Sequence, residues 1–328
     1  MPPPTECWYE GRAMTDSWWA QRPVLVTGGA GFIGSHLTDA LIAKGAKVSV
    51  LDCADSPDRL QPVMDRITYL HADAVAWDLP AAGTERFDVI YHLAAFSMLT
   101  AAERSPELTY RQNVMGIANM LRIARRCAVT KFIFTSAGGL YTNVPKYLPI
   151  DEQHPIDPAQ GVYVMTKRIG ELLCEEFHRQ YGVPSVVFRL FNTYGPRQSA
   201  DFLIPALIKE ACERGTITVR SEQVRRDFTF VQDMVEALLK GAESDFIGGP
   251  VNLGTGTAHG LGDVAEHIAR LLGAKVQCLH QPAFGPSNQV CNNARARQVL
   301  NWQPAVSLEQ GLAMTVNALK EQFAVSPT

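Results

Sequence analysis

The sequence predicts an α/β fold: a doubly wound parallel sheet with a smaller C-terminal α/β lobe. Two observations support this prediction. From residue 23 to residue 190, short continuous apolar runs alternate with helical stretches, as in parallel sheets that are covered on both faces. Beyond residue 191 the alternation loosens, and proline and glycine interrupt the chain, for example in Gly248-Gly249-Pro250 and Gly285-Pro286.

The elements of the sheet are expected in a regular order. Apolar runs predict strands at residues 24–26, 47–51, 67–71, 88–92, 131–135 and 185–190. Helical stretches connect them at about residues 31–44, 106–127 and 162–181. In the C-terminal part, residues 202–214, 233–241 and 262–272 are expected to be helical.

A glycine-rich turn joins the first strand to the first helix. Val24-Leu25-Val26 leads into Gly28-x-x-Gly31-x-x-Gly34, a Rossmann-type pattern whose helix N-terminus attracts a pyrophosphate through its N–H groups and dipole. The second strand is followed by Asp52, whose carboxylate is placed to accept both ribose hydroxyls and to repel a 2′-phosphate. The pattern predicts binding of NAD rather than NADP. A solvated turn residue is the alternative interpretation of Asp52.

Two further segments are expected to line the same site. Asp73 follows the third strand and is placed to meet the adenine amino group. His92-Leu93-Ala94-Ala95 closes the fourth strand with small residues, which let the chain pass close beneath the cofactor.

These motifs suggest a division into domains. Residues 22–190 are expected to form the NAD-binding Rossmann domain, to which the chain returns at about residues 227–256. Residues 191–226 and 257–328 are expected to form the substrate-binding lobe. Residues 1–21 show no periodicity, so we expect a disordered N-terminal extension there, with Met14 as an alternative start.

Charge and composition exclude several classes of protein. The 30 Lys and Arg against 33 Asp and Glu leave a net charge of −3, so no strong field attracts nucleic acid or an anionic membrane. No apolar run approaches the roughly 20 residues of a membrane span, and the start lacks a secretory profile. The seven cysteines include no CxxC pair, which predicts reduced thiols in a cytoplasmic protein and no metal site.

A tyrosine and a lysine form the candidate catalytic pair. Tyr163 and Lys167 lie four residues apart, so they share one face of the expected helix. A free tyrosine has a pKa of roughly 10, and a nearby ammonium together with the positive nicotinamide favours its phenolate. Tyr163 is then able to take a proton from a substrate hydroxyl while hydride leaves the same carbon. A surface Tyr and Lys would be the alternative interpretation of an isolated YxxxK pattern.

With these motifs the chain resembles the extended short-chain dehydrogenases/reductases, in the NAD-dependent nucleotide-sugar epimerase/dehydratase family. The resemblance covers about residues 23 to 320. Beyond both motifs it rests on Asp73, residues 92–95, Asn113 and the segments 189–196, 226–228, 231–233 and 252–256.

The resemblance implies a full set of site residues. The implied catalytic residues are Tyr163, Lys167 and Ser136. The implied cofactor-binding residues are Gly28, Gly31, Phe32, Ile33, Gly34, Asp52, Asp73, Ala74, Leu93, Ala94, Ala95, Asn113, Tyr163, Lys167 and Leu190. The implied substrate-binding residues are Ser97, Ala137, Asn192, Leu203 and Arg226.

Several of these residues have specific expected roles. Asn192 is expected at the phosphate region of the sugar nucleotide. Arg226 is expected at the pyrophosphate, which suits a guanidinium, and Arg225 is the alternative. Leu190 and Phe191 are expected beside the nicotinamide, with Phe191 as a core residue the alternative.

The loop after the fifth strand departs from the family pattern. Relatives have Ser or Thr four residues before the loop tyrosine, where this chain has Ala137, and Ser136 is expected to substitute. Relatives that dehydrate or decarboxylate carry acidic residues in this stretch, whereas Gly138-Gly139 carries none. Without a second acid or base, the remaining reaction is oxidation at C4, rotation of the keto sugar and return of hydride, which is 4-epimerisation.

A second departure lies near the C-terminus. Relatives usually have an arginine in an Arg-Pro-Gly-Asp-like stretch, whereas this chain has Gly285-Pro286-Ser287-Asn288-Gln289. Either Arg220 compensates for the missing arginine or the substrate is unusual.

The sequence therefore predicts an NAD-dependent 4-epimerase of a UDP-sugar. The alternatives are a 4,6- or 5,6-dehydratase, a uronate decarboxylase, a 4-keto reductase, or a catalytically silent NAD-binding regulatory protein. The resemblance also implies a homodimer paired through the helices at 106–127 and 162–181. Ile169, Leu172, Leu173 and Phe177 form an apolar stripe on the second helix, although a helix that covers a sheet needs such a stripe as well.

Overall fold

The computed structural model describes residues 18–80, 86–157, 160–281 and 288–323. The chain divides into two compact units. The first unit comprises Met1–Leu140, Pro158–Arg189 and Leu238–Pro250, and the second comprises Tyr141–Asp157, Leu190–Ala237 and Val251–Thr328. Most of the expected N-terminal extension, at residues 1–17, lies outside the described residues.

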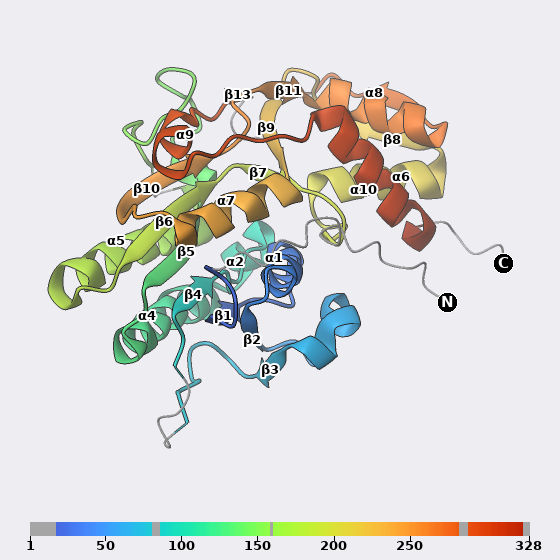
Figure 1. Cartoon of the computed structure of the whole chain (residues 1–328). Helices are drawn as coiled ribbons and strands as arrows, with labels where there is room; N and C mark the ends of the chain where they lie inside the picture. Colours follow the sequence, from blue (N-terminus) through green and yellow to red (C-terminus); the bar gives the residue numbers. More distant parts are fainter. Residues whose placement is uncertain (1–17, 81–85, 158–159, 282–287, 324–328) are drawn as a thin grey trace. The chain divides into compact units, whose positions relative to one another are not determined.

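A seven-stranded sheet organises the first unit (Figure 1). Its strands are β1 (Pro23–Thr27), β2 (Lys47–Asp52), β3 (Thr68–His71), β4 (Val89–His92), β5 (Lys131–Ala137), β6 (Ser185–Leu190) and β10 (Gly248–Leu253). Their order in the sheet is β10-β6-β5-β4-β1-β2-β3, and the pairings from β5 to β3 are parallel. The doubly wound parallel sheet predicted from the sequence is confirmed.

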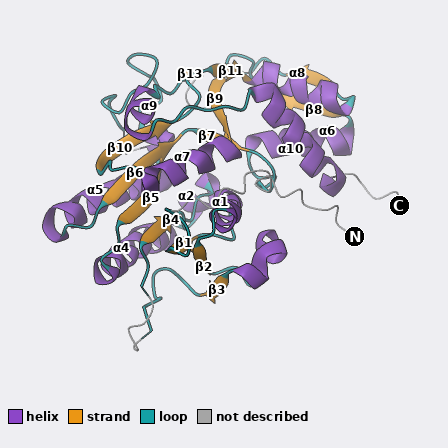
Figure 2. Cartoon of the chain, in the orientation of Figure 1, coloured by secondary structure: helices purple, strands orange, loops and turns teal. Residues whose placement is uncertain are grey.

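Helices cover both faces of this sheet (Figure 2). The covering helices include α1 (Phe32–Ala43), α4 (Gly116–Cys127), α5 (Val162–Tyr181) and the end of α7 (Val231–Glu243). On β5, Phe132 and Phe134 join an apolar cluster with Met120 of α4, while Ile133 lies against Gly241 of α7. Because side chains alternate along a strand, the continuous apolar run of β5 needs a helix on each side.

The long helix expected at residues 106–127 is present with a change of winding. It consists of α3 (Pro106–Tyr110), a π-helical segment η2 (Arg111–Met115) and α4. Such segments often occur at functional sites, and this one contains Asn113. The short helix α2 (Leu99–Arg104) precedes α3, and the 3₁₀ segments η1 (Asp58–Arg66) and η3 (Gly138–Leu140) were not expected from the sequence.

The end of the expected extension belongs to the first unit. Trp18 to Gln21 form a turn, Trp19 is fully buried, and its Nε1 donates a hydrogen bond to the Glu243 carboxylate. The boundary expected at residue 21 is therefore too late, because burial of a large indole removes a substantial apolar surface from water.

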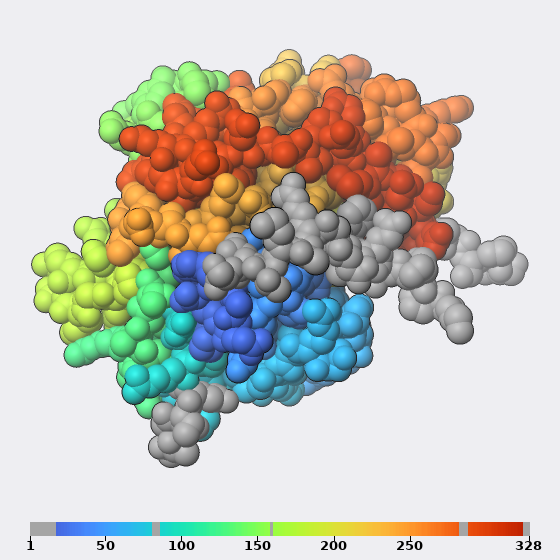
Figure 3. All heavy atoms as spheres, viewed as in Figure 1, coloured from blue at the N-terminus to red at the C-terminus, as the bar shows by residue number. Residues whose placement is uncertain are grey.

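Within its described residues, the second unit combines two small sheets with four complete helices and the start of α7. Strands β7 (Asn192–Tyr194), β9 (Arg225–Phe230), β11 (Ala258–Gly260) and β13 (Asn288–Gln289) form one sheet, and β8 (Thr216–Val219) pairs in parallel with β12 (Lys275–Cys278). The helices are α6 (Leu203–Arg214), α8 (Leu261–Leu272), α9 (Ala294–Leu300) and α10 (Leu308–Phe323). Helix α10 packs against α6 and α8, and its red surface lies beside the orange surface of α8 in Figure 3.

Two further predictions concern the whole chain. No helix among the described residues is long and apolar enough to cross a membrane. None of the six cysteines in the described part of the chain forms a disulfide.

Candidate active site

The glycine-rich turn lies where the strand order of the sheet reverses. Strand β1 pairs with β2 on one side and β4 on the other, and the carboxyl ends of two such strands form the crevice in which α/β sheets bind ligands. A Cβ on Gly28 would lie 2.6 Å from the Ala94 backbone nitrogen, and a Cβ on Gly34 would lie 2.2 Å from the Gly28 carbonyl oxygen. Only glycine fits at these two positions.

Helix α1 begins directly at this turn. Its N-cap is Gly31, which supplies no side-chain hydrogen bond, and its first turn contains no acidic residue. The first turn includes Phe32 and Ile33, both half-buried. An uncapped, uncharged helix start suits a bound phosphate, so the turn fits the pyrophosphate of a dinucleotide.

Two aspartates follow the neighbouring strands. The Asp52 carboxylate accepts hydrogen bonds from the Ala30 N–H at 2.9 Å and the Ala54 N–H at 3.1 Å. It is therefore held beside the glycine-rich turn, where a ribose would lie. The Asp73 carboxylate accepts a hydrogen bond from the Gln112 side chain at 3.1 Å, which connects the end of β3 to η2.

Asn113 connects the chain after β4 to helix α5. Its Oδ1 accepts the Phe96 N–H at 2.7 Å, and its Nδ2 donates to the Phe96 carbonyl at 3.2 Å and to Thr166 Oγ1 at 2.9 Å. Asn113 is buried, and Thr166 immediately precedes Lys167. The structure thus places Asn113 as a support for the segment that contains Leu93, Ala94 and Ala95.

Tyr163 and Lys167 lie together on α5, as expected from their spacing. The Lys167 Nζ is 5.7 Å from the centre of the Tyr163 ring and donates a hydrogen bond to the Thr135 carbonyl at 2.8 Å. Burial lowers the pKa of Lys167 to about 8, although the Glu171 carboxylate opposes this change. Burial also raises the pKa of Tyr163 to about 12. Burial therefore keeps the Tyr163 phenol protonated at neutral pH.

The Ser136 hydroxyl has a different partner from the one expected. It donates a 2.6 Å hydrogen bond to Glu171, whereas Tyr163 Oη has no hydrogen-bond partner within the described part of the chain. Ser136 was expected to support Tyr163, but no hydrogen bond joins the two side chains in the described part of the chain. The physical reason is the nearby carboxylate, which is a stronger acceptor than a neutral phenol.

Glu171 is a site residue that the sequence analysis missed. Arg189 binds it through Nε at 2.8 Å and Nη2 at 2.7 Å, and Arg168 Nη1 lies 2.9 Å from its Oε2. Burial alone would raise the pKa of Glu171, but the hydrogen bonds from Arg189, Ser136 and Arg168 lower it overall. The signal in the sequence was the spacing, because Glu171 follows Lys167 by another helical turn.

The second unit carries the expected phosphate-binding residues. Strand β7 pairs with β9, and Asn192 Nδ2 donates to the Asp227 carbonyl at 3.1 Å, next to Arg226. The half-buried Arg226 donates through Nη1 to the Arg225 carbonyl at 2.9 Å. Arg225 is exposed and donates instead to the Ala258 carbonyl at 2.7 Å. The two neighbouring arginines therefore bind different carbonyl groups.

Asp227 belongs to the segment 226–228 on which the resemblance rests, but the sequence predicted no role for it. Its buried carboxylate accepts hydrogen bonds from the Thr255 N–H at 2.8 Å, the Thr255 hydroxyl at 2.6 Å, the Gly256 N–H at 2.9 Å and the Cys291 N–H at 3.1 Å. Asp227 thereby fixes the glycine-containing segment 252–256 beside β9. Burial raises the pKa of this carboxyl group despite these donors.

The remaining predicted residues occupy varied positions. Phe191 is buried with Tyr141, Ile150 and Cys291, which favours the core interpretation. Leu203 is the first residue of α6 and is 39% exposed. Ala74 belongs to the core of the first unit, Ser97 is exposed, and Leu93, Ala94, Ala95, Ala137 and Leu190 are half-buried. Residues 285–287 of the second sequence departure lie outside the described residues, and Arg220 donates to Gln281 at 3.2 Å.

One protein-family model matches the part of the chain that contains most of these elements. Residues 24–254 match the model of the NAD dependent epimerase/dehydratase family. The chain belongs to this family. The match includes the glycine-rich turn, the Tyr163–Lys167 pair and residues 252–254 of the segment 252–256, and the resemblance drawn from the sequence is confirmed.

Relatives within the epimerase/dehydratase family catalyse more than one reaction. The chain is 33% identical to a UDP-glucose 4-epimerase of Mycolicibacterium smegmatis, over 91% of this chain and 98% of that protein. It is 30% identical to UDP-glucuronic acid decarboxylase 4 of Arabidopsis thaliana, over 91% of this chain and 69% of that protein. The crystal structure of UDP-glucuronic acid 4-epimerase from Bacillus cereus, in complex with UDP-glucuronic acid and NAD, is 28% identical, with a TM-score of 0.83 over 92% of this chain and 99% of that one.

These similarities show an NAD-dependent enzyme of the nucleotide-sugar-converting family. They support the predicted cofactor, and solved relatives hold NAD. Epimerases and decarboxylases are about equally similar to the chain, so similarity does not choose between their reactions.

Proposed function

We propose that this enzyme is a UDP-sugar 4-epimerase that works through a transient 4-keto sugar. The observation that carries the proposal is a Tyr163–Lys167 pair without an acidic residue at Gly138-Gly139. A Cβ on Gly139 would meet no heavy atom within 4 Å, so space for a side chain exists but no carboxylate occupies it. A dehydratase needs such a group for proton removal and leaving-group protonation.

The residues of the chain have separate roles in this reaction. The glycine-rich turn and Asp52 would hold NAD, which supplies a hydride acceptor and donor when bound. Tyr163 takes the proton of the C4 hydroxyl and returns it after the keto sugar has rotated. Lys167, fixed by the Thr135 carbonyl, stabilises the phenolate by its charge. Asn192 and Arg226 bind the diphosphate of the substrate.

A panel of nucleotide sugars tests this proposal. The enzyme would be incubated with UDP-glucose, UDP-galactose, UDP-N-acetylglucosamine and UDP-glucuronic acid, and products would be followed by NMR. We expect a C4 epimer with all atoms retained. Release of water or carbon dioxide would instead identify a dehydratase or a decarboxylase.

A substitution of the catalytic tyrosine gives the first testable prediction. Tyr163→Phe removes the proton carrier and is expected to lower kcat by roughly 10³-fold, within the range of general acid–base catalysis. Tyr181→Phe, at the exposed end of the same helix, is the matched control and should retain wild-type kcat. If Tyr163→Phe kept full turnover while NAD stayed bound, a different proton carrier would have to be sought.

We further propose a homodimer that pairs through α4 and α5. Leu173 and Phe177 pack on the core of the first unit, so they serve the sheet. Leu172, in contrast, is 46% exposed and is available for a partner helix. The cytoplasmic location stays a prediction.

A further inference from the structure

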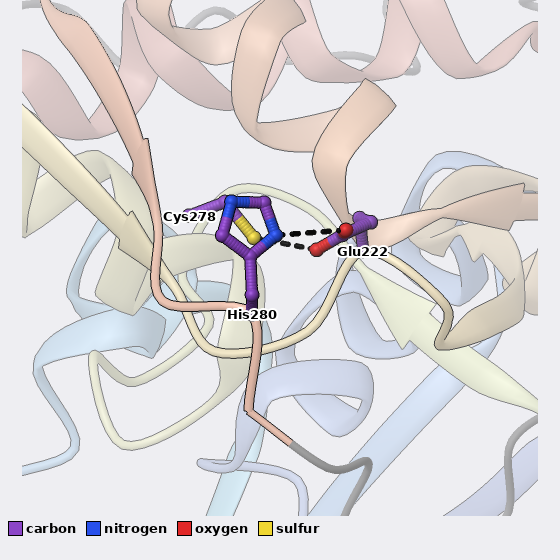
Figure 4. Close-up of side chains that lie close together, drawn as sticks. All are labelled: Glu222, Cys278 and His280. Atoms are coloured by element: carbon purple, nitrogen blue, oxygen red, sulfur yellow. Dashed lines mark hydrogen bonds and ion pairs between the residues drawn. The ribbon is translucent and has the colours of Figure 1, made fainter.

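Three side chains with metal-binding chemistry converge on the surface of the second unit (Figure 4). Glu222 lies in the turn between β8 and β9, Cys278 is the last residue of β12, and His280 follows it by two residues. One donor atom from each of the three lies within 4.8 Å of the others. Glu222 lies more than fifty residues before Cys278 and His280 in the sequence, so no short metal-binding motif joins the three.

The backbone explains why these residues meet. Strands β8 and β12 pair in parallel, with Val219 opposite Cys278. The pairing continues past both strands, because the Leu279 N–H donates to the Val219 carbonyl at 2.9 Å and the Gln281 N–H donates to the Arg220 carbonyl at 2.8 Å. The chain after β12 therefore runs beside the turn that carries Glu222.

One carboxylate contacts both other side chains. Cys278 Sγ lies 2.6 Å from Glu222 Oε2, and His280 Nδ1 lies 3.0 Å from Glu222 Oε1. Zinc binds sulfur at about 2.3 Å, imidazole nitrogen at about 2.0–2.1 Å and carboxylate oxygen at about 2.0–2.2 Å. Around a tetrahedral zinc ion these bond lengths place the donor atoms about 3.3–3.6 Å from one another. The three donor atoms already lie within 4.8 Å of one another, so rotation of exposed side chains brings them to one ion, and the 2.6 Å contact between Cys278 Sγ and Glu222 Oε2 lengthens on binding.

We propose that Glu222, Cys278 and His280 bind a zinc ion, with water as the fourth ligand. Thiolate, imidazole and carboxylate together suit zinc, whereas magnesium and calcium prefer oxygen ligands alone. Binding releases the thiol proton of Cys278 to solvent. Glu222 and His280 are exposed and Cys278 is half-exposed, so the ion reaches the site from solution.

A bound ion would fasten the end of β12 to the turn before β9. That turn leads within four residues to Arg226, which is the proposed pyrophosphate ligand. An ion that binds only the folded lobe also stabilises it by mass action. Zinc binding at this site is separate from the proposed epimerisation, since no ligand belongs to the Tyr163–Lys167 pair.

Zinc titration of the full-length, untagged enzyme tests the proposal. Protein would be stripped with a chelator, dialysed, and titrated with zinc alone by isothermal calorimetry, with metal analysis after equilibrium dialysis. We expect one zinc per chain. Glu222→Gln, Cys278→Ser and His280→Gln are each expected to weaken binding by at least about 10-fold, in line with the loss of a ligand. Cys212→Ser on α6 and His267→Gln on α8 are matched controls that should bind as wild type.

Cobalt substitution gives an independent readout. A cobalt–thiolate charge-transfer band is expected in the wild type and in Cys212→Ser, and should be lost in Cys278→Ser. Circular dichroism would establish that each variant is folded. Zinc binding that is absent from the wild type, or unchanged in folded Cys278→Ser and His280→Gln, would overturn the proposal.

Discussion

At the scale of single residues, Ser136 and Glu171 show how a buried charge organises its surroundings. The side chains of Glu171 and Arg189 are only 3% and 4% exposed, so neither charge is solvated by water. Loss of one partner from a buried pair leaves the other uncompensated. The hydroxyl of Ser136 satisfies a further lone pair of the same carboxylate, which links β5 to α5 just beyond the catalytic pair.

Replacement of Glu171 tests this organisation. Glu171→Gln is expected to lower the free energy of unfolding by about 3 kcal/mol at pH 7, because it removes one charge of the buried Glu171–Arg189 ion pair. Glu176→Gln removes an exposed ion pair with Arg179 on the same helix and should cost at most about 1 kcal/mol. Chemical denaturation of both variants measures the difference.

The difference in stability between the wild type and Glu171→Gln should depend on pH. Because the pKa of Glu171 is lowered in the folded state, its stabilising contribution is present above the unfolded pKa of 4.5 and is lost as the pH falls through the folded value. The wild type and Glu171→Gln should therefore converge in stability below about pH 4.5. A constant difference down to acid pH would contradict this account.

Ser136 provides a separate prediction. Ser136→Ala is expected to lower the free energy of unfolding by about 1 kcal/mol, the usual net value of one hydrogen bond, and to leave kcat nearly unchanged. Steady-state kinetics and denaturation on the same preparation distinguish stability from catalysis. A large fall in kcat with unchanged stability would restore Ser136 to the catalytic group.

At the scale of secondary-structure elements, the start of α5 is held by a neighbouring helix. The Glu103 carboxylate of α2 accepts the Val162 N–H at 2.7 Å, which places a negative charge at the positive end of the helix. Gly161 precedes this contact with φ of 140°, and a Cβ there would lie 2.5 Å from Glu103 Oε1. The geometry fixes the first turn of α5, which contains Tyr163.

Removal of this cap should loosen the first turn. Glu103→Gln is expected to cost about 0.5–1 kcal/mol and to speed amide hydrogen exchange at residues 162–165. Glu107→Gln, exposed on the neighbouring α3, is the control and should leave exchange in α5 unchanged. Equal exchange in both variants would show that Glu103 does not cap the helix.

At the scale of the whole molecule, the proposed dimer makes a prediction about mass. Leu172→Asp places a charge in the proposed contact between α5 helices and is expected to give a species with the mass of one chain by light scattering. Leu271→Asp alters a leucine of similar exposure on α8, 43% against 46%, and should leave the dimer intact. A wild type that elutes with the mass of one chain would contradict the dimer.

The elements that could be predicted from the sequence share one physical property. Strands β1, β4, β5 and β6 are almost entirely buried, so each appears as a continuous apolar run. Strands such as β7, β11 and β13 have only two or three residues, which is too short for a periodic pattern. The Tyr163–Lys167 pair was predictable because its contact lies within one helix.

Contacts between segments that are distant in the sequence could not be predicted without the fold. Arg189 meets Glu171 only because β6 lies beside α5, and Cys278 meets Glu222 only because β12 pairs with β8. The role of Ser136 depended on such a contact as well. Spacing along one element is visible in a sequence, whereas the choice between possible hydrogen-bond acceptors is not.

The close approach of Gly28 to the backbone of Ala94 limits how this enzyme could be re-engineered. A methyl group at position 28 would collide with the backbone of the adjacent strand end, so variation there damages the sheet before it alters any specificity. Asp52 lies beside the same turn, where the N–H groups of Ala30 and Ala54 donate to its carboxylate. Efforts to change the preferred dinucleotide should therefore start at residue 52 and leave the glycines untouched.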